Sequence, residues 1–158
     1  MRRATLAIAV AAAGLFGCPG HLQADGVYAL TADQVVRDEC GLASDPNVFK
    51  ELSLQVAGDV VRADYSLYGI QLAGGFLEGP LFAPAERFAM DGSAANVGTL
   101  VNGQECLLDL VTVHLEGASR DRASFSGNLA VKLDTQRPDS CVCELWLTYQ
   151  AKLAVAPP

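Results

Sequence analysis

The sequence predicts an all-β fold, an antiparallel meander of about eight or nine strands that forms a small barrel or a two-sheet sandwich. Two observations predict it: apolar and polar residues alternate with period two over most of the chain, and glycine-containing turn pairs separate the alternating runs. Long stripes of period 3.6 are scarce. A meander of this size is expected to close into a barrel or fold into a two-sheet sandwich, because open edges invite aggregation, and the barrel is slightly preferred.

The turn pairs divide the chain into its expected strands. Gly58-Asp59 suits a type II′ turn because glycine comes first, whereas Asp91-Gly92 and Asn102-Gly103 supply the positive φ angles of a type I′ turn. The expected strands are 26–34, 50–57, 60–68, 70–77, 86–90, 93–101, 105–117, 122–134 and 140–155. A helical turn is expected at DPNVFKEL, and TADQVVRDECG is either helical or a strand that runs into a cysteine-tied loop.

Each strand has one face that is expected to point inward, since side chains alternate across a strand. The inward positions include Leu52, Leu54, Val56, Val61, Ala63, Tyr65, Leu67, Val111, Val113, Leu115, Phe125, Leu129, Val131, Leu133, Cys141, Cys143, Leu145, Leu147, Tyr149 and Ala151. On the last strand the outward face carries Trp146 among polar residues. Gly127 interrupts its strand and predicts a bend or bulge.

Four cysteines follow residue 18, and they predict two disulfides: Cys40, Cys106, Cys141 and Cys143. Cys141 and Cys143 share a strand face at a spacing of roughly 6.5–7 Å, which is long and poorly oriented for a mutual disulfide. One of them is therefore expected to pair with Cys40 and the other with Cys106, in either order. A four-cysteine zinc site is disfavoured because the paired C-x-x-C spacing is absent.

The first residues read as an export signal. Arg2 and Arg3 precede the uncharged run 4–16, which is too short to span a bilayer as a helix. The following Leu15-Phe16-Gly17-Cys18 resembles the lipobox of bacterial lipoproteins. That resemblance implies a signal peptide over 1–17 and acylation of Cys18, and it covers only the first eighteen residues. From the rest of the sequence we expect a short tether over 18–25 with a solvated His21, and one β-domain over 26–158. The alternative is an ordinary signal peptide cut further on, for instance after Ala24.

Charge restricts the partners of the mature chain. Without Arg2 and Arg3, nine basic residues remain against eighteen acidic ones, which leaves a net charge of about −9. Such a surface is not expected to bind nucleic acid, and acyl chains rather than a basic face are expected to hold it on a membrane. Pro19, where related lipoproteins retained at the inner membrane carry aspartate, implies the outer membrane, on its periplasmic side or at the cell surface.

No pattern in the sequence predicts an enzyme, a cofactor or a metal. His114 and Glu116 lie on the outward face of one strand, where an H-x-E pair could ligate a metal, but a third ligand is missing and a polar outer face is the preferred interpretation. No G-x-S-x-G motif and no phosphate-binding glycine loop occur. Catalytic residues are therefore not assigned.

Two binding functions remain. The nearly uncharged segment YGIQLAGGFLEGPLFAP is expected to form two buried strands joined at Gly74-Gly75, or alternatively an apolar lip or docking patch. The candidate contact residues are Tyr68, Phe76, Phe82 and Trp146. The first function is a lipid-anchored envelope protein that binds a protein or an envelope polymer. The alternative is a carrier of a small apolar ligand, which resembles lipocalins in strand count and disulfides, although DGVYAL lacks their G-x-W signature.

Overall fold

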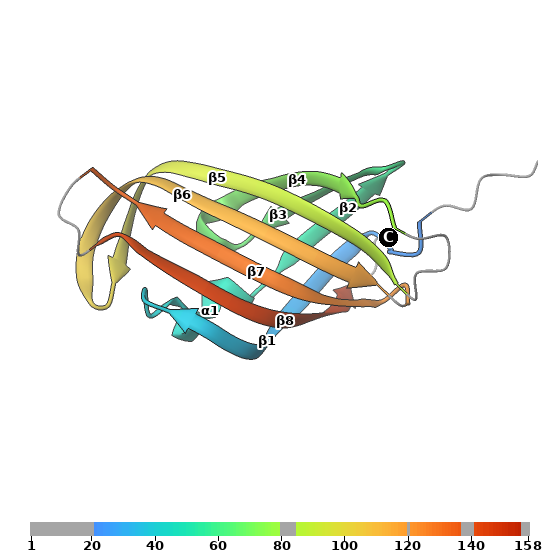
Figure 1. The fold of residues 1–158 in the computed structure, drawn as a ribbon, viewed down its shortest axis with the longest axis horizontal. Coiled ribbons are helices and arrows are strands. Elements are labelled where there is room, and N and C mark those ends of the chain that lie inside the picture. The colour runs from blue at the N-terminus through green and yellow to red at the C-terminus, as the bar shows by residue number, and fades with distance from the viewer. Residues whose placement is uncertain (1–20, 80–84, 120, 137–140, 156–158) are drawn as a thin grey trace, which may run out of the picture.

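A computed structural model describes residues 21–79, 85–119, 121–136 and 141–155, and it shows a closed antiparallel barrel (Figure 1). The strands follow one another around the barrel in sequence order, and β1 closes the ring by pairing with both β2 and β8. The strands are β1 (Gly26–Asp38), β2 (Leu52–Ala57), β3 (Val60–Tyr65), β4 (Ile70–Phe76), β5 (Glu86–Val101), β6 (Gln104–Ser119), β7 (Ser124–Asp134) and β8 (Cys143–Val155). The all-β prediction is confirmed, and closure selects the barrel over the sandwich.

Two of the turns are formed as the sequence predicts. Asn102 and Gly103 both have positive φ, 49° and 82°, and join β5 to β6. Gly58 has a φ of 60° between β2 and β3, whose last pair is Ala57 with Val60. These residues tolerate left-handed backbone, which is what a two-residue hairpin requires.

The predicted turn at Asp91-Gly92 is wrong, and β5 runs through it as one strand. Both residues pair with β6, Asp91 with His114 and Gly92 with Val113. Glycine serves close approach here and not a turn, because a Cβ at Gly92 would lie 2.4 Å from the carbonyl oxygen of Gln71. The described residues therefore form eight strands, where the separate ranges 86–90 and 93–101 predict nine.

The predicted junction at Gly74-Gly75 is also absent, because β4 continues through both glycines. A Cβ at Gly74 would lie 1.9 Å from the carbonyl oxygen of Ala89 on β5. Gly74 lets the backbones of β4 and β5 approach at the barrel wall, whereas a Cβ at Gly75 would lie 2.8 Å from the carbonyl oxygen of Asp59 in the β2–β3 turn.

The connection from β1 to β2 packs against the barrel core. β1 pairs with β2 only from Gly26 to Tyr28, while its remainder pairs with β8. The segment TADQVVRDECG is thus strand as far as Asp38. The short helices η1 (Leu42–Ser44) and α1 (Pro46–Phe49) follow it and bury Leu42 and Val48, and α1 confirms the turn expected at DPNVFKEL.

Side chains occupy the barrel interior. The predicted inward residues are buried, and Val56 alone among them is only partly buried. The ring centroid of Phe125 lies 5.0 Å from that of Tyr28, 5.2 Å from Phe88 and 6.0 Å from Tyr149. Phe88 covers Gly117 on the neighbouring strand, where a Cβ would lie 2.2 Å from the ring. Eight strands enclose a space that such side chains can fill.

Both disulfides lie at one end of the barrel, here called the disulfide end. Cys40 pairs with Cys143, and Cys106 pairs with Cys141. The prediction that the two late cysteines take distant partners is confirmed, and two disulfides indicate an oxidising, non-cytoplasmic compartment. The opposite end, here called the N-terminal end, carries residues 21–25, the β2–β3 turn and the β6–β7 turn (Figure 1).

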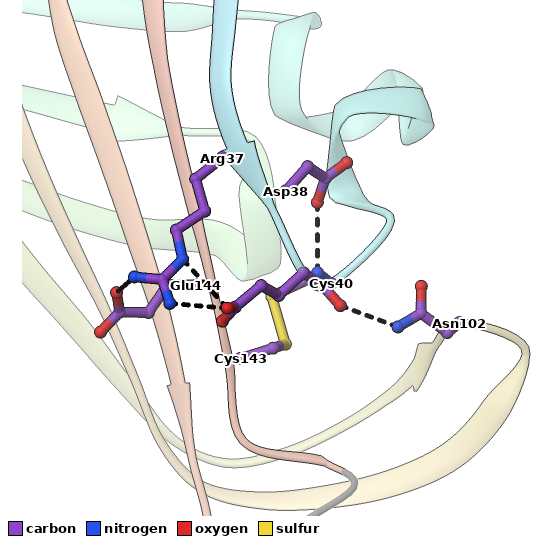
Figure 2. Close-up of polar contacts among 7 residues, drawn as sticks. Arg37, Asp38, Cys40, Asn102, Cys143 and Glu144 are labelled. Atoms are coloured by element: carbon purple, nitrogen blue, oxygen red, sulfur yellow. Dashed lines mark hydrogen bonds and ion pairs between the residues drawn. A yellow bond between two sulfur atoms is a disulfide. The ribbon is translucent and has the colours of Figure 1, made fainter.

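Polar contacts reinforce the first disulfide (Figure 2). The carboxylate of Asp38 accepts hydrogen bonds from three backbone N–H groups, including that of Cys40 at 3.2 Å. The amide of Asn102 donates to the carbonyl of Glu39 at 2.8 Å, which ties the β5–β6 turn to the end of β1. Arg37 forms ion pairs with Glu39 and Glu144.

No helix within the described ranges is long and apolar enough to cross a membrane.

Candidate functional site

Trp146 stands on the outer face of β8, as the alternation of that strand predicts. It is 52 % exposed, whereas its neighbour Leu147 is 2 % exposed and faces the core. Its partner across β7 is Ala130 and its partner across β1 is Arg37. The small side chain of Ala130 leaves space beside the indole ring.

The strand register extends this position into a row across four strands. Asp91 on β5 lies opposite His114 on β6, His114 lies opposite Ala130 on β7, and Ala130 lies opposite Trp146 on β8. A groove of about 460 Å³ follows this row. Its lining residues are Asp91, Gly92, Ser93, Thr112, Val113, His114, Ala130, Val131, Lys132 and Trp146. We call this the Trp146 groove.

An acid–imidazole pair forms one end of the Trp146 groove. Nδ1 of His114 lies 2.7 Å from Oδ1 of Asp91, and Nε2 lies 3.6 Å from Oε1 of Glu116. The hydrogen bond to Asp91 raises the pKa of His114 above its ordinary value of 6.5. A hydrogen bond donated by Asn128 holds the pKa of Glu116 below its usual value. The carboxylates of Asp91 and Glu116 therefore fix the position of the imidazole.

Lys132 supplies a cation in the same groove. It lies opposite Thr112 on β6 and Glu144 on β8. Glu144 forms its ion pair with Arg37, and Lys132 has no ion pair among the described residues. The groove thus combines an exposed aromatic ring, hydroxyl groups from Ser93 and Thr112, and an available ammonium group. This set can stack on an apolar ring face and hydrogen-bond hydroxyl or acidic groups around it.

The other predicted contact residues do not join Trp146 in one surface. Tyr68 is half-buried near the disulfide end, and its hydroxyl lies 2.9 Å from that of Thr99. Phe76 is the last residue of β4 and lies at the N-terminal end of the barrel, packed between His21 and Phe88. Phe82 lies outside the described residues. The segment around Gly74 therefore forms part of the barrel wall, as strand β4.

A second groove of about 630 Å³ lies at the disulfide end, beside the β5–β6 hairpin. Exposed leucines line it, with Leu100 61 % exposed and Leu107 44 % exposed. The disulfide-bonded Cys106 and Cys141 also line it. No sequence pattern singled out this groove, because the bend of a long hairpin decides its shape.

Sequence reasoning also missed Asp91 and Lys132 as site residues. The sequence predicts a turn at Asp91, and Lys132 lies between the inward positions Val131 and Leu133 without a pattern that marks it as a contact residue. Both residues point outward on their strands. Only the register of four strands shows that they share a surface with Trp146.

The structure tests the zinc site considered for the four cysteines. All four cysteines of the domain are in disulfides, which rejects the zinc alternative. Within the part of the chain that the structure describes, no group of three or more His, Cys, Asp or Glu side chains is placed to hold a metal ion.

Protein-family models, curated proteins and solved structures contain no match to this chain.

Proposed function

We propose that this protein is a lipid-anchored bacterial envelope protein whose barrel binds an envelope polymer through the Trp146 groove. The observation that carries the binding function is the groove itself, which places an exposed indole ring beside the ammonium group of Lys132, hydroxyls and an imidazole. The lipid anchor rests on the lipobox-like Leu15-Phe16-Gly17-Cys18. The disulfides support export.

A polymer chain suits this site better than a flat protein partner. A standard protein interface buries ~800 Å² on each partner, whereas a groove of about 460 Å³ has the size of a small-ligand site. The ammonium group of Lys132, which forms no ion pair within the described ranges, favours a chain with acidic groups. An acidic glycan of the cell envelope has this chemistry, with ring faces for Trp146 and hydroxyls for the polar groups.

The binding experiment uses a property of the chain, which has a single tryptophan. Soluble peptidoglycan fragments and lipopolysaccharide are titrated separately while the emission of Trp146 is recorded. We expect a saturable change with one of them, and a several-fold weaker affinity for Lys132→Ala. Leu107→Ala, in the other groove, is the matched control and should bind as the wild type does. Binding to Trp146→Ala, which has no tryptophan, is measured by isothermal titration calorimetry. Binding that survives both Lys132→Ala and Trp146→Ala, or binding only to a protein from the envelope, contradicts the assignment.

The anchor is tested separately. Mass spectrometry of the mature protein should find an acylated amino-terminal Cys18. Cys18→Ser should move the protein from the membrane fraction to the soluble fraction while the disulfides still form. An unmodified amino terminus beyond residue 18 would refute the anchor and leave the groove untouched.

A further inference from the structure

Residues 21–25 do not form a free tether but lie across the N-terminal end of the barrel. The ring of His21 stacks on Phe76 with centroids 3.5 Å apart. Its Nε2 lies 3.1 Å from a carboxylate oxygen of Asp59, and its Nδ1 lies 3.5 Å from one of Glu86. The expectation that His21 is solvated is therefore wrong. We call residues 21–25 the N-terminal segment.

A buried polar network fixes the middle of the N-terminal segment. Gln23 is 4 % exposed and Ser119 is 0 % exposed. The hydroxyl of Ser119 donates to the side-chain oxygen of Gln23, and the Gln23 amide donates to the hydroxyl of Tyr28. The Tyr28 hydroxyl lies 2.7 Å from the carbonyl oxygen of Ala24, to which it donates. Pulling Gln23 away would remove the acceptor of the buried Ser119 hydroxyl, which is costly.

Backbone contacts fix the rest of the N-terminal segment. The N–H of Leu22 donates to Glu86 at 2.6 Å, and that of Ala24 donates to the carbonyl of Arg122 at 3.2 Å. Asp25 accepts a hydrogen bond from the N–H of Val56 at 2.7 Å. The N-terminal segment is thus bonded to β2, β5 and the β6–β7 turn, so it cannot swing as a flexible linker.

The distance from the proposed anchor to this segment is short. Only Pro19 and Gly20 separate Cys18 from His21. At ~3.6 Å per residue, the three steps from Cys18 to His21 span at most ~11 Å. A strand as long as β6, with 16 residues, extends ~50 Å. An acyl group on Cys18 can therefore keep only the N-terminal end near a bilayer.

We infer, on the basis of the proposed acylation of Cys18, that the N-terminal end of the barrel lies against the lipid headgroups and the disulfide end points away from them. Val60 and Leu77 are exposed at the N-terminal end, by 42 % and 41 %. Exposed carboxylates of Asp59 and Glu78 flank them. These charges limit the contact to the headgroup layer, so the acyl chains supply the affinity and the N-terminal segment supplies the orientation.

Two matched leucines allow the orientation to be measured. Leu77 at the N-terminal end and Leu107 at the disulfide end have nearly equal exposure, 41 % and 44 %. In a Trp146→Phe background, Leu77→Trp and Leu107→Trp each give a single tryptophan at a known end. The acylated full-length proteins are reconstituted in phosphatidylcholine vesicles that contain a headgroup-nitroxide lipid. We expect quenching several-fold stronger for Leu77→Trp than for Leu107→Trp, and weak quenching of Trp146 in the wild type.

A longer tether is the control for the N-terminal segment. Inserting about ten Gly/Ser residues between Gly20 and His21 adds a flexible reach of ~17–19 Å. The lengthened protein should stay in the membrane fraction but lose most of the difference between the two tryptophan positions. Acylated protein with equal quenching at both ends would overturn the orientation while leaving the anchor intact. An unmodified Cys18 would overturn both.

Discussion

Trp146 and Leu147 are adjacent on β8 and face opposite environments. Because Trp146 is 52 % exposed and Leu147 is 2 % exposed, truncation of each should affect different properties. We expect Leu147→Ala to lower the free energy of unfolding by ~2–5 kcal/mol and Trp146→Ala to change it by no more than ~0.5 kcal/mol. Urea denaturation measures both. Similar losses for the two variants would mean that Trp146 is structural and not a contact residue.

The pKa of His114 depends on its contact with Asp91. Because the hydrogen bond to Asp91 raises its pKa above 6.5, Asp91→Asn should lower the pKa of His114 toward that value. The chemical shifts of the imidazole protons, followed by NMR across pH, measure this change. Glu105→Gln, on the distant hairpin, should leave the titration unchanged. An unaltered pKa in Asp91→Asn would refute the pairing.

The raised pKa of His114 also makes the free energy of unfolding depend on pH. Folding favours protonated His114, so the stabilisation is fully present below about pH 6.5 and is lost as pH rises through the raised pKa. Since the His114 side chain is 45 % exposed, this contribution is screened by solvent and small.

At the scale of elements, glycines decide how closely neighbouring strands approach. A Cβ at Gly74 would lie 1.9 Å from the carbonyl oxygen of Ala89, whereas nothing lies within 4 Å of one at Gly98. We expect Gly74→Ala to destabilise the barrel by ~1–3 kcal/mol or more and Gly98→Ala to stabilise it by up to ~1 kcal/mol. Thermal unfolding followed by circular dichroism compares them. Equal effects would show that β4 and β5 do not approach as described.

The two disulfides close loops of different length. Cys40–Cys143 has a sequence separation of 103 and Cys106–Cys141 one of 35. In the chain-entropy model these loops stabilise the fold by ~4.7 and ~3.8 kcal/mol. The double variant Cys40→Ser/Cys143→Ser should therefore have the lower denaturation midpoint in guanidinium chloride. A lower midpoint for Cys106→Ser/Cys141→Ser would mean that native contacts of the hairpin outweigh loop length.

At the scale of the whole molecule, the filled interior distinguishes surface binding from a carrier function. A closed eight-stranded barrel is compatible with a lipocalin-like carrier. However, Tyr28, Phe88, Phe125 and Tyr149 project inward and are at most 3 % exposed. We expect delipidated protein not to bind a fluorescent fatty-acid probe with measurable affinity. Stoichiometric binding that competes with unlabelled fatty acid would instead support the carrier.

The sequence predicts much of the fold because one face of every strand is buried. Period-two alternation assigns residues such as Val113 and Tyr149 to the core, and a one-residue slip would expose them. The turn prediction was wrong where a glycine lies within a strand and allows a neighbouring strand to approach. Asn102-Gly103 forms a turn, while Asp91-Gly92 lies within β5, and only the position of β4 against β5 distinguishes the two cases.

By itself, the sequence determined the strand class, the inward faces, the outward position of Trp146 and the long-range pairing of the cysteines. These follow from local alternation and from the geometry of a single strand. The tertiary structure alone decided closure, the order of the disulfides, the row from Asp91 to Trp146 and the docking of His21. Those features join residues far apart in the chain, and their contacts depend on register and barrel curvature, which no local pattern encodes.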